Sequence, residues 1–344
     1  MKPDRQAFLH IGMEKTGTTT IQSFMANNRE GLRRRAVAYP ETPGHANHLK
    51  LNAYALNDDV FDDTRTRYGV HDASDLHAFR QEFRAQLAAE IARLEDCRKF
   101  VFSNEHCSAR LTTSEEANRL LTVFEPHFSD IRVILYLREQ GGNMASSYST
   151  KLRNGSSHLP EDDEIEWEKY EYYHRVKRWS DQVGRSNLDV RVYERKAFVA
   201  GDLLLDFFDA IEEIEENGDY FMPDRKNERL GASTLEMIRT FNELAPSLLD
   251  SEDIPEARGN LVRALEQLPQ GATLAFPEEK LAELRNQFSE SNRRLAQEFF
   301  DRDFLFTTYE SSSNDRDEVP WRELTREEVL DLMVRSAMTW NVRS

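Results

Sequence analysis

The feature that most constrains the fold is a short apolar segment that runs directly into a glycine-bounded loop near the N-terminus. Residues 7–11 read AFLHI, which is typical of a short buried strand. Gly12 and Gly17 bound the next segment, and apolar side chains then recur at helical spacing over residues 21–32. A strand, a tight loop and a helix start aim backbone N–H groups and the positive end of the helix dipole at one point. The sequence therefore predicts an anion-binding site over residues 12–20.

This loop differs from a Walker phosphate loop in the position of its lysine. Gly12 and Gly17 have the spacing of G-x-x-x-x-G-K-[ST], but Thr18 stands where nucleoside triphosphatases have lysine. The lysine of this loop is Lys15, which lies between the two glycines. There it would lie against the group bonded to a 5′-phosphate and neutralise charge that develops on a bridging oxygen. The pattern favours a short phosphosulfate tail without metal over a Mg²⁺-bound triphosphate.

Residues 10–22 resemble the phosphosulfate loop of sulfotransferases that use 3′-phosphoadenosine-5′-phosphosulfate (PAPS), in particular the bacterial carbohydrate-type members. The H-x-G-x-x-K-T-G-T-T-x-x-Q pattern of that family is matched by His10, Gly12, Lys15, Thr16, Gly17, Thr18, Thr19 and Gln22. The resemblance implies that Lys15 and the backbone of residues 16–19 hold the 5′-phosphosulfate, and that Lys15 stabilises the leaving phosphate. It implies PAPS as the co-substrate and 3′,5′-ADP as the product. His10 is expected to be a packed residue at the end of the strand.

A second motif follows the most apolar strand of the chain. Residues 131–137 form a nearly continuous apolar run, as expected for a strand buried on both faces of a parallel sheet. Arg138 ends this run, and Ser146 follows in the next expected helix. By the same resemblance, Arg138 and Ser146 hold the 3′-phosphate that distinguishes PAPS from ATP. A guanidinium offers bidentate charged contact, and a hydroxyl near a helix N-terminus adds a donor.

The match to this family is incomplete in two places. Gln140 stands where the family has a proline, which affects the stiffness of the loop more than its chemistry. The C-terminal R-K-G-x-x-G-D-W motif is absent, since Arg225 and Lys226 are not followed by its glycines. The residues that bind the adenine therefore remain unassigned.

Sulfuryl transfer is an in-line displacement, so the acceptor needs a base opposite the leaving phosphate. Residues 99–103 predict a strand, and Glu105 and His106 follow its end. Side chains at the carboxyl ends of parallel strands lie over the ligand crevice. The resemblance to heparan-type members makes Glu105 the base. His106 is the rival, because imidazole transfers protons near neutral pH without help, and a structural role for both stays open.

Strands that alternate with helices predict an α/β fold. We expect a three-layer, P-loop-like domain with a central parallel sheet flanked by helices, plus helical additions toward the C-terminus. The 344 residues are expected to form a single domain over 1–344. Polar, irregular sequence over about 40–75 predicts a long loop or insertion, and the chain from about 227 to 344 predicts a mainly helical extension.

Composition and charge exclude several classes of protein. The net charge of −17 argues against a nucleic-acid-binding protein and requires any positive potential to be local. Cys97 and Cys107 lack metal-ligand spacing, which indicates two reduced thiols in a cytoplasmic protein without a metal site. The sequence has neither a secretory h-region nor the about 20 consecutive apolar residues of a transmembrane helix.

The sequence thus predicts a PAPS-dependent sulfotransferase that acts on a hydroxyl or amine. The partner is a small-molecule or glycan acceptor, with a carbohydrate or glycolipid hydroxyl as the first guess, and the oligomeric state is not predicted. Two alternatives remain: a P-loop kinase that uses ATP, and a non-catalytic nucleotide- or glycan-binding protein of the same fold. Mg²⁺-dependent affinity that ignores the 3′-phosphate would indicate the kinase. Tight binding of 3′,5′-ADP without transfer would indicate the binding protein.

Overall fold

The computed structural model describes residues 4–213, 220, 229–307 and 317–340. Its contacts group the chain into two compact units. The first unit consists of Met1–Arg138, Glu171–Lys226 and Ser291–Leu305. The second consists of Glu139–Tyr170, Asn227–Glu290 and Phe306–Ser344. The expectation of a single domain over 1–344 stays a prediction.

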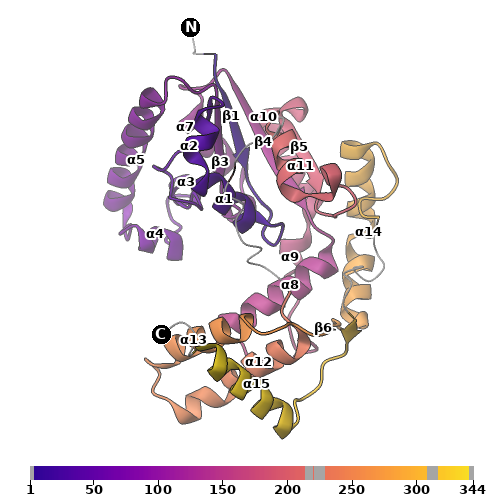
Figure 1. Ribbon diagram of the computed structural model, residues 1–344. Helices are drawn as coiled ribbons and strands as arrows, with labels where there is room; N and C mark the ends of the chain where they lie inside the picture. The colour runs from indigo at the N-terminus through magenta and orange to yellow at the C-terminus, as the bar shows by residue number, and fades with distance from the viewer. Residues whose placement is uncertain (1–3, 214–219, 221–228, 308–316, 341–344) are drawn as a thin grey trace. The chain divides into compact units, whose positions relative to one another are not determined.

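The first unit is built on a five-stranded, all-parallel sheet with the order β2-β3-β1-β4-β5 (Figure 1). Its strands are β1 (Gln6–His10), β2 (Val37–Ala38), β3 (Lys99–Ser103), β4 (Asp130–Leu137) and β5 (Leu188–Val192). The central strand β1 ends with His10, which pairs with Ser103 of β3 and Ile134 of β4. The segments that follow β1, β3 and β4 therefore leave the sheet at the same edge.

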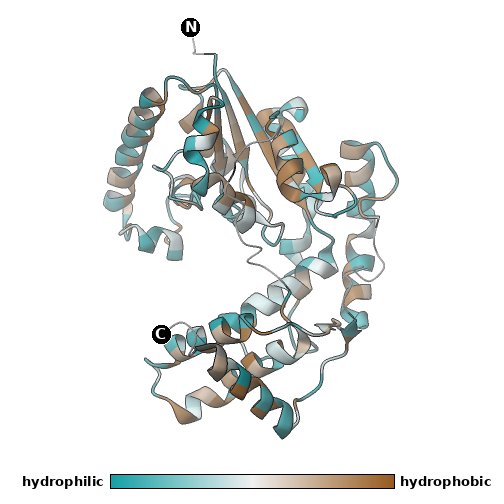
Figure 2. Cartoon of the chain, in the orientation of Figure 1, coloured by the Kyte–Doolittle hydropathy of each residue, from teal (hydrophilic) through white to brown (hydrophobic). Residues whose placement is uncertain are grey.

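Helices cover both faces of this sheet, so the predicted three-layer α/β fold is confirmed. The helices of the unit are α1 (Thr18–Asn27), α2 (Arg29–Arg33), α3 (Lys50–Ala55), α4 (Asp63–Arg67), α5 (Ala73–Arg93), α6 (His106–Arg110), α7 (Ser114–Phe124), α10 (Tyr172–Val183) and α11 (Leu203–Ala210). On one face, α1 and α11 pack against Phe8, Val101 and Ile134. On the other, Phe124 of α7 packs against Phe102 of β3 with ring centroids 4.6 Å apart. Hydrophobic residues colour much of the strands in Figure 2.

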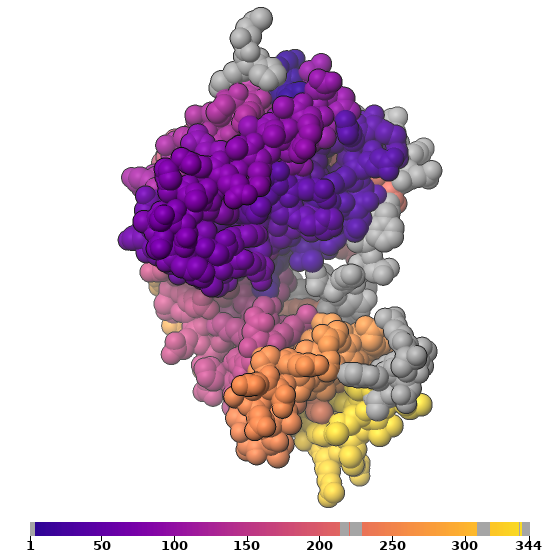
Figure 3. Space-filling view, turned by 90° about the vertical axis from the view of Figure 1, so that its left-hand side faces the viewer, coloured from indigo at the N-terminus to yellow at the C-terminus, as the bar shows by residue number. Residues whose placement is uncertain are grey.

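The stretch expected as a long loop or insertion over about 40–75 is partly helical. It contains the whole of α3 and α4 and the beginning of α5. The first two helices have only 6 and 5 residues, too few to repeat an apolar stripe that periodicity would detect. Helix α5 lies on the outer side of the first unit, the side that faces the viewer in Figure 3.

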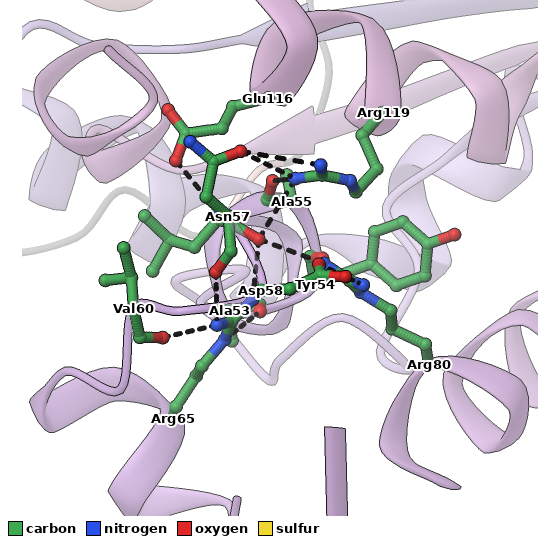
Figure 4. A network of polar contacts seen from close by, with 11 residues as sticks. Ala53, Tyr54, Ala55, Asn57, Asp58, Val60, Arg65, Arg80, Glu116 and Arg119 are labelled. Carbon is green, nitrogen blue, oxygen red and sulfur yellow. Dashed lines mark hydrogen bonds and ion pairs between the residues drawn. The ribbon is translucent and has the colours of Figure 1, made fainter. Parts of the chain in front are cut away.

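Three arginines hold the turn that follows α3 (Figure 4). Arg65 is fully buried, while Arg80 and Arg119 approach the same turn from α5 and α7. The three side chains donate to the carbonyls of Ala53, Tyr54, Ala55, Leu56, Asn57 and Val60. The last carbonyls of a helix have no partner within it, so these donors replace the missing bonds.

The second unit is mainly helical, which confirms the predicted helical additions. Its elements are α8 (Gln140–Arg153), α9 (Trp167–Tyr170), α12 (Ala232–Leu248), α13 (Ile254–Glu266), α15 (Arg326–Trp340) and the short parallel pair β6 (Thr273–Leu274) and β7 (Glu318–Val319). Helix α14 (Glu278–Phe300) includes residues of both units. A buried ion pair joins Glu236 to Arg239, and the Trp321 indole N–H donates to the same carboxylate at 2.7 Å. Within the described ranges, every helix is too short or too polar to cross a membrane.

Candidate functional site

The loop between β1 and α1 is held against β4 by main-chain hydrogen bonds. The Met13 N–H donates to the carbonyl of Tyr136 at 3.0 Å, and the Tyr136 N–H donates to the carbonyl of Gly12 at 2.7 Å. Inside the loop, the hydroxyl of buried Thr16 donates to the carbonyl of Met13 at 2.6 Å. These bonds extend the pairing of the sheet beyond the end of β1 and hold the loop in place.

Three residues of this loop have left-handed backbone conformations. Their φ angles are 104° at Gly12, 66° at Lys15 and 72° at Gly17. At Gly17 the positive φ favours glycine, and a Cβ atom would also lie 2.3 Å from the tip of the Leu203 side chain, which would have to move. Lys15 has no such freedom, and a side-chain-bearing residue in this region costs about 1–3 kcal/mol. The fold sustains this cost, because Arg138 Nη1 donates to the Lys15 carbonyl at 2.8 Å.

Helix α1 begins at Thr18 with Gly17 as its N-cap. Within the described chain, no side chain caps this helix start, and its first turn contains no acidic residue. The carbonyl of Gly17 accepts from the N–H groups of Thr20 and Ile21. The N–H groups of Thr18 and Thr19 belong to the first turn, which has no intrahelical acceptor for them. Gly17, Thr18 and Thr19 thus form the helix start that the sequence predicts for anion binding.

Glu105 lies at the carboxyl end of β3, directly against this loop. A Cβ atom on Gly12 would lie 2.9 Å from the Glu105 Cα, so the two backbones touch where only glycine fits. The Glu105 carboxylate accepts hydrogen bonds on both of its oxygens. Gln22 Nε2 donates to Oε2 at 2.7 Å, and Asn47 Nδ2 donates to Oε1 at 3.1 Å.

His106, the rival base, also contacts the loop. Its Nδ1 lies 3.2 Å from a carboxylate oxygen of Glu14. The distance is that of an ion pair if the ring is protonated, but this nitrogen makes no hydrogen bond to any described residue. The two side chains therefore form an ion pair only when the ring is protonated, and otherwise lie close together without a hydrogen bond. Both candidate bases lie against the loop that carries Lys15, through Gly12 for Glu105 and through Glu14 for His106, and their assignment stays a prediction.

A buried polar cluster lies beneath Glu105. Ser103 Oγ is 2.9 Å from His10 Nδ1 and 3.3 Å from Gln22 Nε2, and the Ser103 N–H donates to His48 Nδ1 at 3.1 Å. Burial lowers the pKa of His10 to about 3 and that of His48 to about 3. Both rings are neutral near pH 7 as a result. His10 is the packed strand-end residue that the sequence predicts.

Arg138 and Ser146 fall in different units. Arg138 directly follows β4, contacts the Lys15 carbonyl, and lies 5.7 Å from the centroid of the Tyr193 ring. Ser146 is half-buried in α8 of the second unit. Their joint role at a 3′-phosphate therefore stays a prediction. Arg225 and Lys226 lie outside the described residues.

Three residues near the site were not identified from the sequence. Gln22 belongs to the loop motif, but its hydrogen bond to Glu105 was not predicted. Its position as a polar residue on the apolar face of α1 could have indicated a buried polar contact. Asn47 lies in the polar stretch expected as a loop and gives no local signal. Arg175 of α10 is 7% exposed, and burial lowers its pKa, an effect that nearby groups including Glu14 of the loop partly offset.

Acidic, histidine and cysteine side chains do not gather into a metal-binding group of three or more within the described ranges. The expectation of chemistry without a metal stays a prediction.

Comparisons with known proteins give partial similarities. No protein-family model matches the chain. An uncharacterized protein of Archaeoglobus fulgidus is 26% identical over 227 residues, which cover 60% of this chain and 59% of that relative, so the match spans about three fifths of its length. The crystal structure of a sulfotransferase from Alicyclobacillus acidocaldarius matches 73% of this chain and 98% of its own, with 15% identity and a TM-score of 0.37. The α/β assignment rests on the sheet described above.

Proposed function

We propose that this chain is a sulfotransferase that transfers a sulfuryl group from PAPS to a hydroxyl or amine of an acceptor. The observation that carries the proposal is the meeting of two segments at one edge of the sheet. The Lys15 loop, with its uncapped helix start, follows β1, and Glu105 follows β3 against Gly12. An in-line transfer of an anionic group requires a positively charged site that binds the group and a base that takes the acceptor proton. The loop and the Glu105 carboxylate supply these two features side by side.

Each group has a role in the proposed reaction. The acceptor oxygen or nitrogen attacks the sulfur, and the bond between sulfur and the bridging oxygen of the 5′-phosphate breaks. Glu105, or His106 in its place, takes the acceptor proton, while Lys15 stabilises the charge on the departing phosphate. The amides of residues 16–19 orient the phosphosulfate. The products are a sulfated acceptor and 3′,5′-ADP, and no metal is needed because lysine and helix start supply the charge.

Arg138 is proposed to hold the 3′-phosphate together with Ser146. Its position after β4 supports this role, since it reaches the main chain of the phosphosulfate loop. Arg138 and Lys15 give a local positive charge in a chain whose net charge is −17. An anionic nucleotide can therefore be bound despite the repulsive field of the whole protein.

Calorimetry with three nucleotides tests the proposal. The chain is expected to bind 3′,5′-ADP more tightly than 5′-AMP, and to bind it without Mg²⁺. Preferential, Mg²⁺-dependent binding of ATP would support a kinase instead. A screen for release of 3′,5′-ADP from PAPS with a panel of hydroxyl and amine acceptors then separates an enzyme from a binding protein, which would bind the nucleotide and transfer nothing.

The chemical class of the acceptor and the cellular location of the protein are each proposed from a single feature of the chain. A carbohydrate or glycolipid hydroxyl is the proposed acceptor because the loop motif resembles that of carbohydrate-type members. A reducing, cytoplasmic location is supported by Cys97 and Cys107, which are both buried and unpaired. Burial also raises the pKa of the Cys107 thiol, so it is protonated and unreactive at neutral pH.

A further inference from the structure

The Glu105 carboxylate accepts hydrogen bonds from two neutral side-chain amides, which come from separate parts of the chain. Gln22 comes from the first turns of α1 and donates to Oε2 at 2.7 Å. Asn47 comes from the segment before α3 and donates to Oε1 at 3.1 Å. One donor on each oxygen fixes the plane of the carboxylate and leaves each oxygen a further lone pair for an incoming proton.

The donor on α1 is itself fixed. Gln22 is 4% exposed, and its Nε2 also lies 3.3 Å from Ser103 Oγ. That hydroxyl is in contact with the ring of His10, which burial keeps neutral. A buried amide with two acceptors has little freedom to rotate, so it can hold Glu105 in one orientation.

The donor from the other side is fixed by groups distant in sequence. The segment 39–48 carries Asn47, and both ends of it are tied down. Arg29 of α2 donates to the Tyr39 carbonyl at 2.8 Å and to the His45 carbonyl. Glu90 of α5 accepts from the N–H groups of residues 41 and 42 at 2.7 and 2.8 Å. These hydrogen bonds therefore fix the segment that places Asn47 next to Glu105.

The neighbouring imidazole is held differently. His106 Nδ1 lies 3.2 Å from a carboxylate oxygen of Glu14 in the phosphosulfate loop. Neutral amides can orient a carboxylate without giving it a proton, so Glu105 stays able to accept one. We infer that Gln22 and Asn47 are positioning residues that hold Glu105 in the orientation in which it takes the acceptor proton; this inference rests on the proposed function and assigns the base to Glu105.

The test measures kcat, KM and 3′,5′-ADP affinity for Gln22→Met and Asn47→Ala, alone and combined with Glu105→Gln. Each single variant is expected to lower kcat by about tenfold or more, because misplacing a catalytic group by about 1 Å can cost about a hundredfold. The affinity for 3′,5′-ADP should stay within about twofold of wild type. In the Glu105→Gln background, where the proton acceptor is gone, the further loss should fall below about twofold. Asn27→Ala, at an exposed position of α1, is the matched control and keeps the wild-type kcat.

Outcomes of this test separate the inference from the proposed function. If the wild type is active and both amide variants keep its kcat, the inference is overturned. It is also overturned if the amide substitutions lower kcat by the same factor in the wild-type and the Glu105→Gln backgrounds. If Gln22→Met does not fold, as thermal unfolding would show, the half-buried Asn47 carries the test. A wild type that binds no 3′,5′-ADP and transfers to no acceptor removes the proposed function, and the inference with it.

Discussion

Arg138 Nη1 donates a hydrogen bond to the main-chain carbonyl of Lys15 at 2.8 Å. The bond joins the end of β4 to the loop that follows β1, at the residue of that loop with a left-handed, non-glycine backbone. The side chain proposed for the 3′-phosphate therefore also supports the loop proposed for the 5′-phosphosulfate. A change at Arg138 should alter both ends of the nucleotide site.

Replacing Arg138 with alanine is expected to lower 3′,5′-ADP affinity by about tenfold to a hundredfold, since a hydrogen bond to a charged group contributes about 1.5–3 kcal/mol. Arg138→Lys should restore little of this, because an ammonium group cannot make a bidentate contact with a phosphate and also reach the Lys15 carbonyl. Titration calorimetry measures both variants. Arg132→Ala is the matched control: it removes an arginine from β4, the strand that Arg138 follows, where Arg132 pairs with Asp130. Wild-type affinity in Arg138→Ala would contradict the prediction.

Gly12→Ala is expected to destabilise the fold and to displace Glu105. The new Cβ would lie 2.9 Å from the Glu105 Cα, and the backbone there has a φ of 104°. Gly184→Ala is the matched control, since Gly184 has a φ of 83° but open space around it. Both changes strain the backbone, and only the first adds a clash. Urea unfolding should show a free energy of unfolding lower by about 1–3 kcal/mol for Gly12→Ala than for Gly184→Ala. Equal values would show that the contact with Glu105 is relaxed at no cost.

The parts of the site that the sequence predicted depend on local pattern and on sheet topology. The strand, the glycines and the helix of residues 7–27 are adjacent in the chain, so their geometry follows from residue types alone. Arg138 and Glu105 follow apolar strands, and parallel strands put their carboxyl ends at one edge. His10 was expected to be packed because it ends the first apolar strand. Local pattern and the rule for parallel strands place these residues near one another, while the roles expected for Lys15, Arg138 and Glu105 came from the resemblance to sulfotransferases.

The remainder of the site depends on contacts between segments far apart in the sequence. Asn47 reaches Glu105 because Arg29 and Glu90 brace its segment, and nothing in the neighbouring sequence indicates either contact. The short helices α3 and α4 depend in the same way on Arg65 and its acceptor carbonyls. A polar sequence of this kind predicts a loop because it has no apolar stripe at helical spacing. Its structure is determined by hydrogen bonds to distant residues instead.

Stability should fall below neutral pH because of His10 and His48. Burial lowers the pKa of each ring from 6.5 to about 3, so the unfolded chain binds protons that the folded chain does not. The free energy of unfolding then rises with pH between those values, with a slope of about 1.4 kcal/mol per pH unit for each ring within the window. Urea unfolding at about pH 5 and about pH 6, both inside the window, measures the slope. His10→Gln should reduce it and exposed His71→Gln should not; an unchanged slope in His10→Gln would show that another group causes it.

Arg65→Met is expected to lower the free energy of unfolding by about 3 kcal/mol or more, because each buried carbonyl that loses its partner costs about 1–3 kcal/mol. Arg65 is 0% exposed and donates to the carbonyls of Ala53, Leu56, Asn57 and Val60. The Leu56 carbonyl also accepts from Arg80 and Arg119, and the Asn57 carbonyl from the Val60 N–H, so the loss falls mainly on the carbonyls of Ala53 and Val60. Arg65→Lys should recover little, since one ammonium group cannot match the forked geometry of a guanidinium. Arg67→Met, on an exposed position of the same helix, is the control and should change stability by less than about 0.5 kcal/mol. Chemical unfolding compares the three variants. A stable Arg65→Met would mean that Arg80 and Arg119 alone hold the turn.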